Sequence, residues 1–534
     1  MMQIPDPIHG YISLDGMFAD IINTPEFQRL RSIEQGSFRP VFPGARHDRF
    51  IHSLGTYHLA SKFVEHFFRN LYADLKIRLP KAEEDMLRTT FCYAALLHDI
   101  GHAPFSHTTE NFFKEAHPIW DDLCSAVGNI SAAEHTLFLN APGKSVGAAH
   151  EIMSALLLIT ERNTFLRKAA PGSVDLPLAA RMVIGFTYRP ADLRVFGSVH
   201  SNQSLGIRNC LIQLLNSSIL DVDRLDYLGR DTLMSGYFNA PLDLDTLAAS
   251  VTAVELDSGM LAPAYRDTAL KVFDLMFQAK LSHDTWVLAS PAGPYDAALL
   301  QHCIRQLHPD YIKEVFTKEA LSSTGKSWND KHYRLLSDVD VAADLKAKSG
   351  GAYDELCTRA LGKRRTAAWR SYYEYHHIFN DPGNGVTPEA VYAFFRPLIK
   401  YLNDNHLFVF DRDAYLTVEN DPKADPKARD AARFLQRYLK SLTTDLEKKQ
   451  QYSVVLLDKT NNFTMKVDPA QIRILFPKTT TPLRAGKYKY STYADLTGIT
   501  AADKRSRDYF YLYRHGGLGY RQLDKLRRSL ARVL

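Results

Sequence analysis

The sequence predicts a mostly α-helical protein with a smaller α+β lobe toward its C-terminal end. Through most of the first 310 residues, apolar side chains recur at helical spacing, as at Leu59, Phe63 and Phe67. The period changes in Tyr452–Val467, where two apolar runs flank Thr460-Asn461-Asn462 in a strand–turn–strand pattern. With 534 residues, the chain also exceeds what one ordinary core supports. We therefore expect residues 1–310 to form a helical core and residues 311–534 to form a helical and mixed α+β lobe with a basic tail.

Three of the expected helices carry residues of chemical interest. The first begins near His52. The second, Met86–Leu97, is apolar on nearly all sides, which is typical of a buried central helix. The third runs from Ile207 to Leu220, and we expect it to continue directly into the segment Asp221–Asp231.

Composition excludes several classes of protein. The chain is 45% hydrophobic and 23% charged, which argues against wholesale disorder. Its formal net charge of +5 permits an anionic substrate but does not demand nucleic acid. The charge is concentrated in Lys504–Leu534, where nine Lys and Arg residues face two Asp residues, a net charge of +7.

Cysteine usage and the N-terminus favour a cytoplasmic protein. The five cysteines are scattered without a CxxC motif, which argues against both a disulfide framework and a thiolate zinc site. The first 15 residues lack the basic start and apolar run of a signal peptide. We expect no transmembrane helix, because no stretch approaches 18 apolar residues.

Four residues form a candidate metal site: His52, His98, Asp99 and Asp223. A divalent ion that acts on phosphates needs nitrogen and oxygen ligands, partial charge neutralisation and open positions for water and substrate. Two imidazoles and two carboxylates meet these needs. Because 171 residues separate the first ligand from the last, the site would join three helices in space.

Each part of this pattern also has a simpler interpretation. A lone His-Asp pair is more often a surface pair or a helix cap, and the group Asp221, Asp223 and Asp226 alone would more often be a solvated acidic face. However, an apolar helix delivers His98-Asp99 toward the interior, where an unpaired charge is costly. The combination therefore favours a metal or an anion at this point.

Five segments of the first half of the chain carry a recognisable pattern: DPIHGYISLD (6–15), INTPEFQRLRSIEQ (22–35), VFPGARHDRFIHSLG (41–55), LLHDIGHAPFSH (96–107) and DVDRLDYLGRD (221–231). In order and spacing they resemble one known family, the HD-domain deoxynucleoside triphosphate triphosphohydrolases, which include SAM-and-HD-domain antiviral enzymes and bacterial relatives. The resemblance is specific for residues 1–235 and faint beyond about residue 300, where QIRILFP (471–477) is similar to the family's C-terminal lobe. It implies an HD-domain helical core that hydrolyses a dNTP to the deoxynucleoside and triphosphate.

The resemblance also implies roles for individual residues. His52, His98, Asp99 and Asp223 would bind the divalent ion, whose identity (Mn, Fe, Mg or Zn) stays open, as does a second Mg ion. His107 would be the general acid toward the leaving 5′-oxygen, with Glu110 as its acidic partner and His102 nearby. Without the resemblance, a hydrogen-bonded core histidine would be the better interpretation of His107 and of His150. The substrate-binding residues would be Gln35, Arg49, His150, Arg224, Tyr227, Asp231 and Lys280.

Two regions depart from the family's pattern. In Phe273–Ser290, Lys280 stands where an arginine is expected, and Leu288 and Ser290 stand where a tyrosine and a histidine are expected, so the base preference stays open. In the effector region, Gln28 and Arg31 match the family, whereas Asn23 replaces an aspartate that suits a guanine edge. We therefore expect an effector other than GTP, or none.

Three functions remain open from the sequence. The leading one is dNTP hydrolysis serving antiviral dNTP depletion, by a homo-oligomer (dimer or tetramer) that a nucleotide effector regulates. The second is an HD phosphodiesterase or nuclease that uses the same metal site. The third is a nucleotide sensor or a nucleic-acid-binding module with vestigial activity, and the basic C-terminal tail would serve nucleic-acid binding. A solvated amphipathic helix is the commoner explanation of such a tail.

Overall fold

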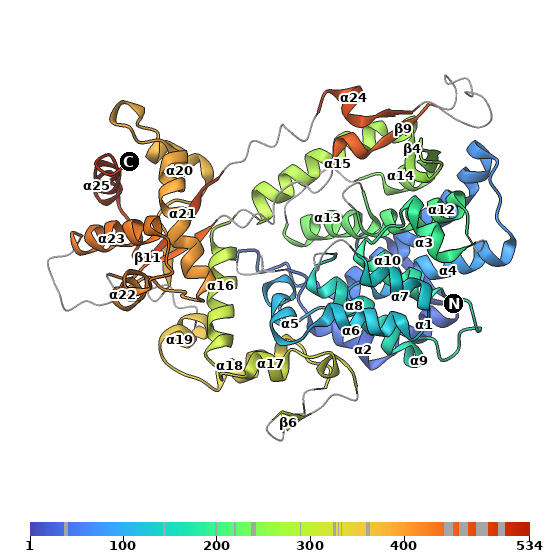
Figure 1. Cartoon of the computed structure of the whole chain (residues 1–534), viewed down its shortest axis with the longest axis horizontal. Coiled ribbons are helices and arrows are strands. Elements are labelled where there is room, and N and C mark those ends of the chain that lie inside the picture. Colours follow the sequence, from blue (N-terminus) through green and yellow to red (C-terminus); the bar gives the residue numbers. More distant parts are fainter. Residues whose placement is uncertain are drawn as a thin grey trace. The chain divides into compact units, whose positions relative to one another are not determined.

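The computed structural model divides the chain into two compact units that interleave along the sequence. The structure describes residues 1–36, 41–141, 146–197, 200–217, 220–236, 242–288, 290–323, 327–328, 331–332, 334–358, 364–442, 452–458, 468–476, 490–499 and 508–534. The first unit comprises residues 1–287, 310–342 and 465–504, and the second comprises residues 288–309, 343–464 and 505–534. Both are largely helical, which confirms the expected fold class (Figure 1).

Two helices at the centre of the first unit provide its core. α3 (Arg49–Leu75) and α4 (Lys81–Leu97) pack against each other, and α8 (Ala149–Thr160), α10 (Leu176–Ile184) and α12 (Asn202–Leu215) also pack on α4 (Figure 1). These neighbours bury every residue from Thr90 to Leu97. The surrounding contacts explain why this segment is apolar on nearly all sides.

The third expected helix is wrong in one respect, because it is two helices. α12 ends at Leu215, and α13 (Val222–Met234) begins after Asp221, which has an extended backbone and accepts a hydrogen bond from the Arg224 N–H. An aspartate in this position is a favourable N-cap, so it starts a new helix and does not continue the previous one. After this break, α13 packs against α3, and Asp223 in its first turn lies next to His52.

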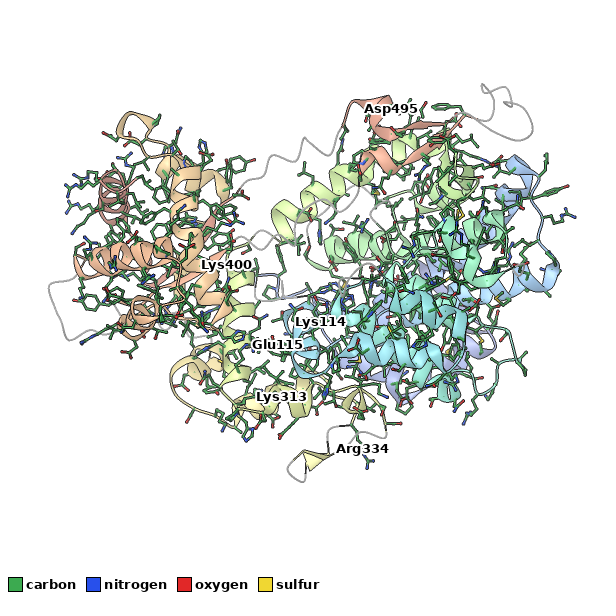
Figure 2. The ribbon with its side chains drawn as sticks, viewed as in Figure 1. Lys114, Glu115, Lys313, Arg334, Lys400 and Asp495 are labelled. Carbon is green, nitrogen blue, oxygen red and sulfur yellow. The ribbon has the colours of Figure 1, made fainter. Side chains whose placement is uncertain are left out.

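The remaining elements of the first unit surround this core. A hairpin of β1 (Met2–Asp6) and β2 (Gly10–Leu14) starts the chain, and a four-stranded sheet has the order β10-β9-β4-β3. The other elements are α1 (Met17–Ile22), α2 (Pro25–Gln28), α5 (Asn111–Ala116), α6 (Ile119–Gly128), α7 (Ala132–Leu139), α9 (Arg162–Phe165), α11 (Leu193–Phe196), α14 (Leu244–Ser250), β3 (Val251–Glu255), β4 (Leu261–Arg266), α15 (Leu270–Ser282), α17 (Tyr311–Val315), β5 (Ser327–Trp328), β6 (Lys331–His332), β9 (Arg473–Leu475), β10 (Tyr490–Thr492) and α24 (Tyr493–Thr497). The helix α18 (Asp338–Lys346) begins in the first unit, and its residues from 343 onward belong to the second. α5 is amphipathic, since it buries Phe112 and Phe113 and exposes Lys114 and Glu115 (Figure 2).

The second unit combines helices with a three-stranded sheet of order β7-β11-β8. Its elements are α16 (Ala292–Arg305), α19 (Gly351–Thr358), β7 (Arg365–Ala367), α20 (Tyr372–Phe379), α21 (Pro388–Asp404), α22 (Arg412–Asn420), α23 (Pro426–Lys440), β8 (Val455–Asp458), β11 (Phe510–His515) and α25 (Tyr520–Leu530). Here β8 pairs with β11, and the expected turn at Thr460-Asn461-Asn462 lies outside the described residues. The basic tail forms β11 and α25 within its described part. In the described residues, no helix combines the length and apolarity needed to cross a membrane.

Candidate metal centre

The structure brings the four expected metal ligands together from three helices of the first unit. His52 lies in the first turn of α3, which begins after the N-cap Asp48. His98 is the C-cap of α4, and Asp99 follows it. Asp223 lies in the first turn of α13. Helix ends are suitable positions for shared ligands, because a side chain there extends beyond the helix toward neighbouring elements.

The ligand atoms converge on one point. His52 Nε2 lies 2.9 Å from Asp223 Oδ1, 3.3 Å from His98 Nε2 and 3.6 Å from Asp99 Oδ2. His98 Nε2 lies 3.5 Å from Asp99 Oδ1 and 3.6 Å from Asp223 Oδ1. One ligand atom each from His52, His98 and Asp99 lies within 4.8 Å of the others, which is close enough for a shared ion.

The outer nitrogens of both imidazoles show that this donor set fits a divalent ion. His52 Nδ1 hydrogen-bonds Asp226 Oδ2 at 2.8 Å, and His98 Nδ1 hydrogen-bonds the carbonyl of Ala95 at 2.8 Å. Metal-binding histidines ordinarily donate their second ring N–H to such acceptors, which leaves the lone pair of the other nitrogen for the ion. Here both Nε2 atoms face the two carboxylates, so the set is two nitrogens and two ionised oxygens.

Electrostatics keep the carboxylates ionised. Burial opposes the charge of Asp99, but Arg49, His98 and His102 hold the pKa of this carboxyl well below its usual range. The side chain of Asp223 is 37% exposed, and the adjacent His52 and His98 hold its pKa well below its usual value. Burial disfavours the charged form of His52, yet Asp223 and Asp226 outweigh it and raise its pKa to about 10. A proton therefore lies on His52 where a metal ion would bind, and the ion would have to displace it.

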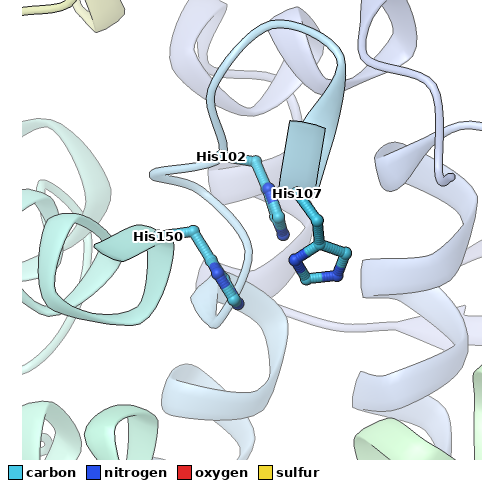
Figure 3. Close-up of side chains that lie close together, drawn as sticks. All are labelled: His102, His107 and His150. Atoms are coloured by element: carbon cyan, nitrogen blue, oxygen red, sulfur yellow. The ribbon is translucent and has the colours of Figure 1, made fainter. Parts of the chain in front are cut away.

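Three histidines that lie close together form a second group (Figure 3). His102 and His107 belong to the loop that follows α4, and His150 lies at the start of α8. The rings of His102 and His150 stack with centroids 4.1 Å apart, and the His107 ring lies 5.1 Å from the first and 5.0 Å from the second. His102 Nε2 is 3.2 Å from Asp99 Oδ1, so one carboxylate adjoins both groups.

Glu110 links two members of this second group. Its carboxylate contacts His150 Nδ1 directly, and its Oε2 lies 3.4 Å from His107 Nδ1. Burial opposes ionisation of Glu110, but His150 and His107 lower its pKa, and in return Glu110 raises the pKa of the buried His150. Burial and the neighbouring Arg49 and His150 hold the pKa of His102 well below its usual value, so this ring is neutral. His107 has a side chain that is 54% exposed, which leaves it accessible from solvent.

A close approach between the loop and α8 brings these histidines together. A Cβ atom on Gly101 would lie 2.3 Å from the backbone nitrogen of Ser154, so only glycine fits. The Gly101 N–H donates to Ser154 Oγ at 2.9 Å and ties the loop to α8. Farther along, Phe105 and Ser106 have positive φ angles of 60° and 52°, and this turn directs the following residue, His107, back toward the group.

Several expected substrate-binding residues already have partners within the chain. Arg49 donates to Asp99 Oδ2 at 2.8 Å, to the Gln35 carbonyl at 2.7 Å and to Ser106 Oγ at 3.1 Å. This arrangement makes it a support for Asp99. Arg224 donates from Nη2 to the Ser217 carbonyl at 3.2 Å. Its Nε and Nη1 atoms, and Oε1 of Gln35, are buried without a hydrogen-bond partner of ordinary geometry in the described part of the chain.

Three of the expected substrate-binding residues, Tyr227, Asp231 and Lys280, lie in a separate network. Asp231 lies 2.7 Å from His47 Nε2 and 3.1 Å from His283 Nε2, and the sequence interpretation named neither histidine. Lys280 pairs with Asp284 at 2.5 Å and lies 5.9 Å above the ring of Tyr227. The structure therefore brings Tyr227, Asp231 and Lys280 into one neighbourhood, with the lysine charge balanced by an adjacent carboxylate.

The expected effector residues lie on and around α2. Arg31 donates to Gln28 Oε1 at 2.9 Å and lies 3.5 Å above the Phe50 ring, whereas Asn23 donates to the Ala19 carbonyl at 2.7 Å. Gln28 and Arg31 are thus in contact. Asn23 is occupied as part of the C-cap of α1.

Comparisons with known proteins agree with this geometry. Residues 49–123 match the HD domain family. The human deoxynucleoside triphosphate triphosphohydrolase SAMHD1 is 34% identical over 344 residues, which cover 64% of this chain and 48% of that protein. The bovine enzyme of the same name is 32% identical over 242 residues, 45% of this chain and 36% of its own. The chain therefore spans half or less of the length of these triphosphohydrolases.

Two other proteins are similar to this chain, and one of them, a solved structure, matches over nearly the whole chain. The uncharacterized protein YwfO of Bacillus subtilis is 27% identical over 360 residues, 62% of this chain and 68% of that protein. The crystal structure of a hypothetical protein from Aquifex aeolicus superimposes with a TM-score of 0.54 at 16% identity and covers 99% of both chains, which shows a shared fold. The chain thus resembles the HD-domain triphosphohydrolases, and the HD match with the His and Asp cluster supports a metal-dependent HD hydrolase.

Proposed function

We propose that the protein hydrolyses deoxynucleoside triphosphates to the deoxynucleoside and inorganic triphosphate. The observation that carries the proposal is the group of His102, His107, His150 and Glu110 directly beside the four metal ligands. The similarity to proteins named deoxynucleoside triphosphate triphosphohydrolases supplies the substrate class.

The proposed chemistry divides between the two groups. When bound by His52, His98, Asp99 and Asp223, a divalent ion would supply charge stabilisation for phosphate oxygens and a water of lowered pKa. His107 would deliver a proton to the leaving 5′-oxygen, since Glu110 stays ionised and can support a protonated imidazole. The exposure of His107 leaves this ring accessible to a ligand that enters from solvent.

The phosphate chain would meet cationic and neutral donors. Arg224 has buried N–H groups at Nε and Nη1 without hydrogen-bond acceptors of ordinary geometry among the described residues, and these suit an anion. Burying a cation without enough acceptors is costly, and a bound phosphate would supply the missing acceptors. His102 is neutral and offers either a donor or an acceptor to a phosphate oxygen. His150, whose pKa is raised by Glu110, adds positive charge near the same place.

The nucleoside end would meet Gln35, Tyr227 and Asp231. Asp231 accepts two histidine N–H groups and still has lone pairs for a sugar hydroxyl. Because Lys280 is paired with Asp284, we assign it a supporting place beside Tyr227. The preferred base stays open.

The proposal extends to regulation and biological role. It includes a homo-oligomer, a nucleotide effector at Asn23, Gln28 and Arg31, and dNTP depletion during antiviral defence. These parts rest on the resemblance and on the contact between Gln28 and Arg31.

Product analysis distinguishes dNTP hydrolysis from the other functions of HD domains. The purified protein is incubated with each dNTP, each rNTP and a cyclic dinucleotide in the presence of Mn²⁺ or Mg²⁺. Release of intact triphosphate with the deoxynucleoside supports the proposal. Nucleoside monophosphates released from the cyclic dinucleotide would indicate a phosphodiesterase, and stoichiometric nucleotide binding without turnover would indicate a sensor.

A further inference from the structure

The N-terminal hairpin reaches the candidate metal centre through a continuous buried network. The turn between β1 and β2 carries Asp6 at its start and His9 near its end. Asp6 Oδ1 accepts the backbone N–H groups of Ile8 and His9, each at 2.8 Å. Asp6 Oδ2 accepts from Arg230 Nη1 of α13 at 2.9 Å, across 224 residues of sequence. The turn is therefore fixed to α13 by an ion pair with both side chains fully buried.

Arg230 also binds Asp226, which lies one turn earlier on α13. Its Nε donates to Asp226 Oδ2 and its Nη2 to Asp226 Oδ1, both at 2.8 Å, in a two-pronged pairing. Such a pairing fixes the plane of the carboxylate as well as its position. Asp226 then meets His52 Nδ1 through Oδ2 and His9 Nε2 through Oδ1, again both at 2.8 Å.

The network leaves Asp226 with little freedom. Four contacts converge on its carboxylate, and its exposure is zero. If one of these partners is removed, a buried charge stays without compensation, which is strongly destabilising. The four contacts of Asp226 therefore depend on one another. The orientation of the His52 ring depends on Asp226, because the hydrogen bond between His52 Nδ1 and Asp226 Oδ2 fixes it.

Gly55 shows how closely α3 fits this network. It lies one turn after His52, and a Cβ atom there would lie 1.9 Å from Asp226 Oδ1 and 2.5 Å from Arg230 Nη2. The helix that carries His52 therefore rests directly on the paired carboxylate and guanidinium. A displacement of that pair would change the position of α3 or the orientation of His52.

We propose that Asp6 and His9 of the hairpin, acting through Arg230 and Asp226, are positioning residues for the metal ligand His52. This inference rests on the metal centre of the proposed function. It adds that the affinity of the site for its ion depends on a turn that contributes no ligand. Partners of metal-bound histidines contribute to affinity because they fix the tautomer and the direction of the ring.

The test compares Mn²⁺ binding by the full chain and four variants, without substrate. Asp6→Asn removes the charge that holds Arg230, and we expect the dissociation constant for Mn²⁺, measured by chelator competition, to rise about 10-fold. His9→Gln removes one contact to Asp226 and should raise it about 3-fold. Two controls should leave it unchanged: Asp15→Asn, an exposed carboxylate just after β2, and Asn70→Ala, a buried amide of α3 that donates to the carbonyls of Ala249 and Val251.

The controls separate positioning from general stability. Asn70→Ala should lower the melting temperature of the metal-free protein and still bind Mn²⁺ as tightly as the unsubstituted chain. Equal affinity for Asp6→Asn and the unsubstituted chain, or equal weakening in Asp6→Asn and Asn70→Ala, would overturn the inference. If Asp6→Asn does not fold, unchanged affinity in His9→Gln would overturn it. Failure of the unsubstituted chain to bind Mn²⁺ would instead overturn the metal centre itself.

Discussion

Two histidine groups occupy neighbouring positions in this protein, and their surroundings differ. In the metal centre, His52 and His98 are buried, and each has its Nδ1 engaged by a fixed acceptor. In the second group, Glu110 is shared by two rings, His107 is half exposed, and neither nitrogen of the buried His102 has a hydrogen bond of ordinary geometry within the described chain. The first group is arranged to hold an ion in one place. The second has the freedom that proton transfer and ligand binding require.

The largest effect is expected from removing ligands of the first group. The double substitution His98→Ala/Asp99→Ala deletes two of the four ligands, so stoichiometric metal binding and hydrolysis should both be lost, the latter by more than about 10³-fold. Metal content and triphosphate release measure the two losses. His377→Ala, an exposed histidine of α20, is the matched control. Normal turnover by the double variant would remove the metal from the mechanism.

Removing the exposed histidine of the second group should separate binding from catalysis. His107→Ala deletes the proposed acid and leaves all four ligands in place, so we expect metal binding to be retained and the rate of hydrolysis to fall about 10²- to 10⁴-fold. Calorimetric metal titration and single-turnover kinetics measure the two properties on one preparation. If metal binding and rate fell together, the distinction between the two groups would be wrong.

Neutralising the shared carboxylate should have a smaller effect. Glu110→Gln keeps the shape of the side chain but removes the charge that raises the pKa of His150. We expect a rate loss of about tenfold for each unit by which the pKa of His150 falls. The rate measured against pH shows this loss, because the limb that depends on protonated His150 should move to lower pH. An unchanged profile with a reduced rate would point to a structural role for Glu110.

The last effect is a gradual one and concerns the pH dependence of metal affinity. His52 has a pKa of about 10 in the metal-free protein, so below that pH an incoming ion must displace a proton. The apparent affinity should therefore rise with pH, by about tenfold per unit for one released proton, and fall as pH decreases. Chelator competition between about pH 6 and about pH 8 measures the slope. Asp226→Asn should flatten it, because the raised pKa depends partly on that carboxylate.

Local sequence patterns predicted correctly those features that depend on a single helix. The buried helix α4 was predicted from its apolar run, and His52 and His98 were placed correctly at helix ends. The continuous helix from Ile207 to Asp231 was wrong because helical periodicity persists on both sides of a break. The capping aspartate Asp221 was the available signal for that break, since its side chain accepts from the Arg224 N–H.

The sequence by itself determined which residues could bind a divalent ion, because ligand chemistry is a property of residue type and of the segments that carry His52, His98, Asp99 and Asp223. Only the tertiary structure decided what holds those ligands. Asp226 and Arg230 lie four residues apart on α13, but their contacts with His52, His9 and Asp6 span between 174 and 224 residues. No local period encodes such contacts, since they arise only when the hairpin, α3 and α13 pack together. For the same reason Gly55 is unremarkable in the sequence and indispensable in the fold: the atoms that exclude a side chain there come from another helix.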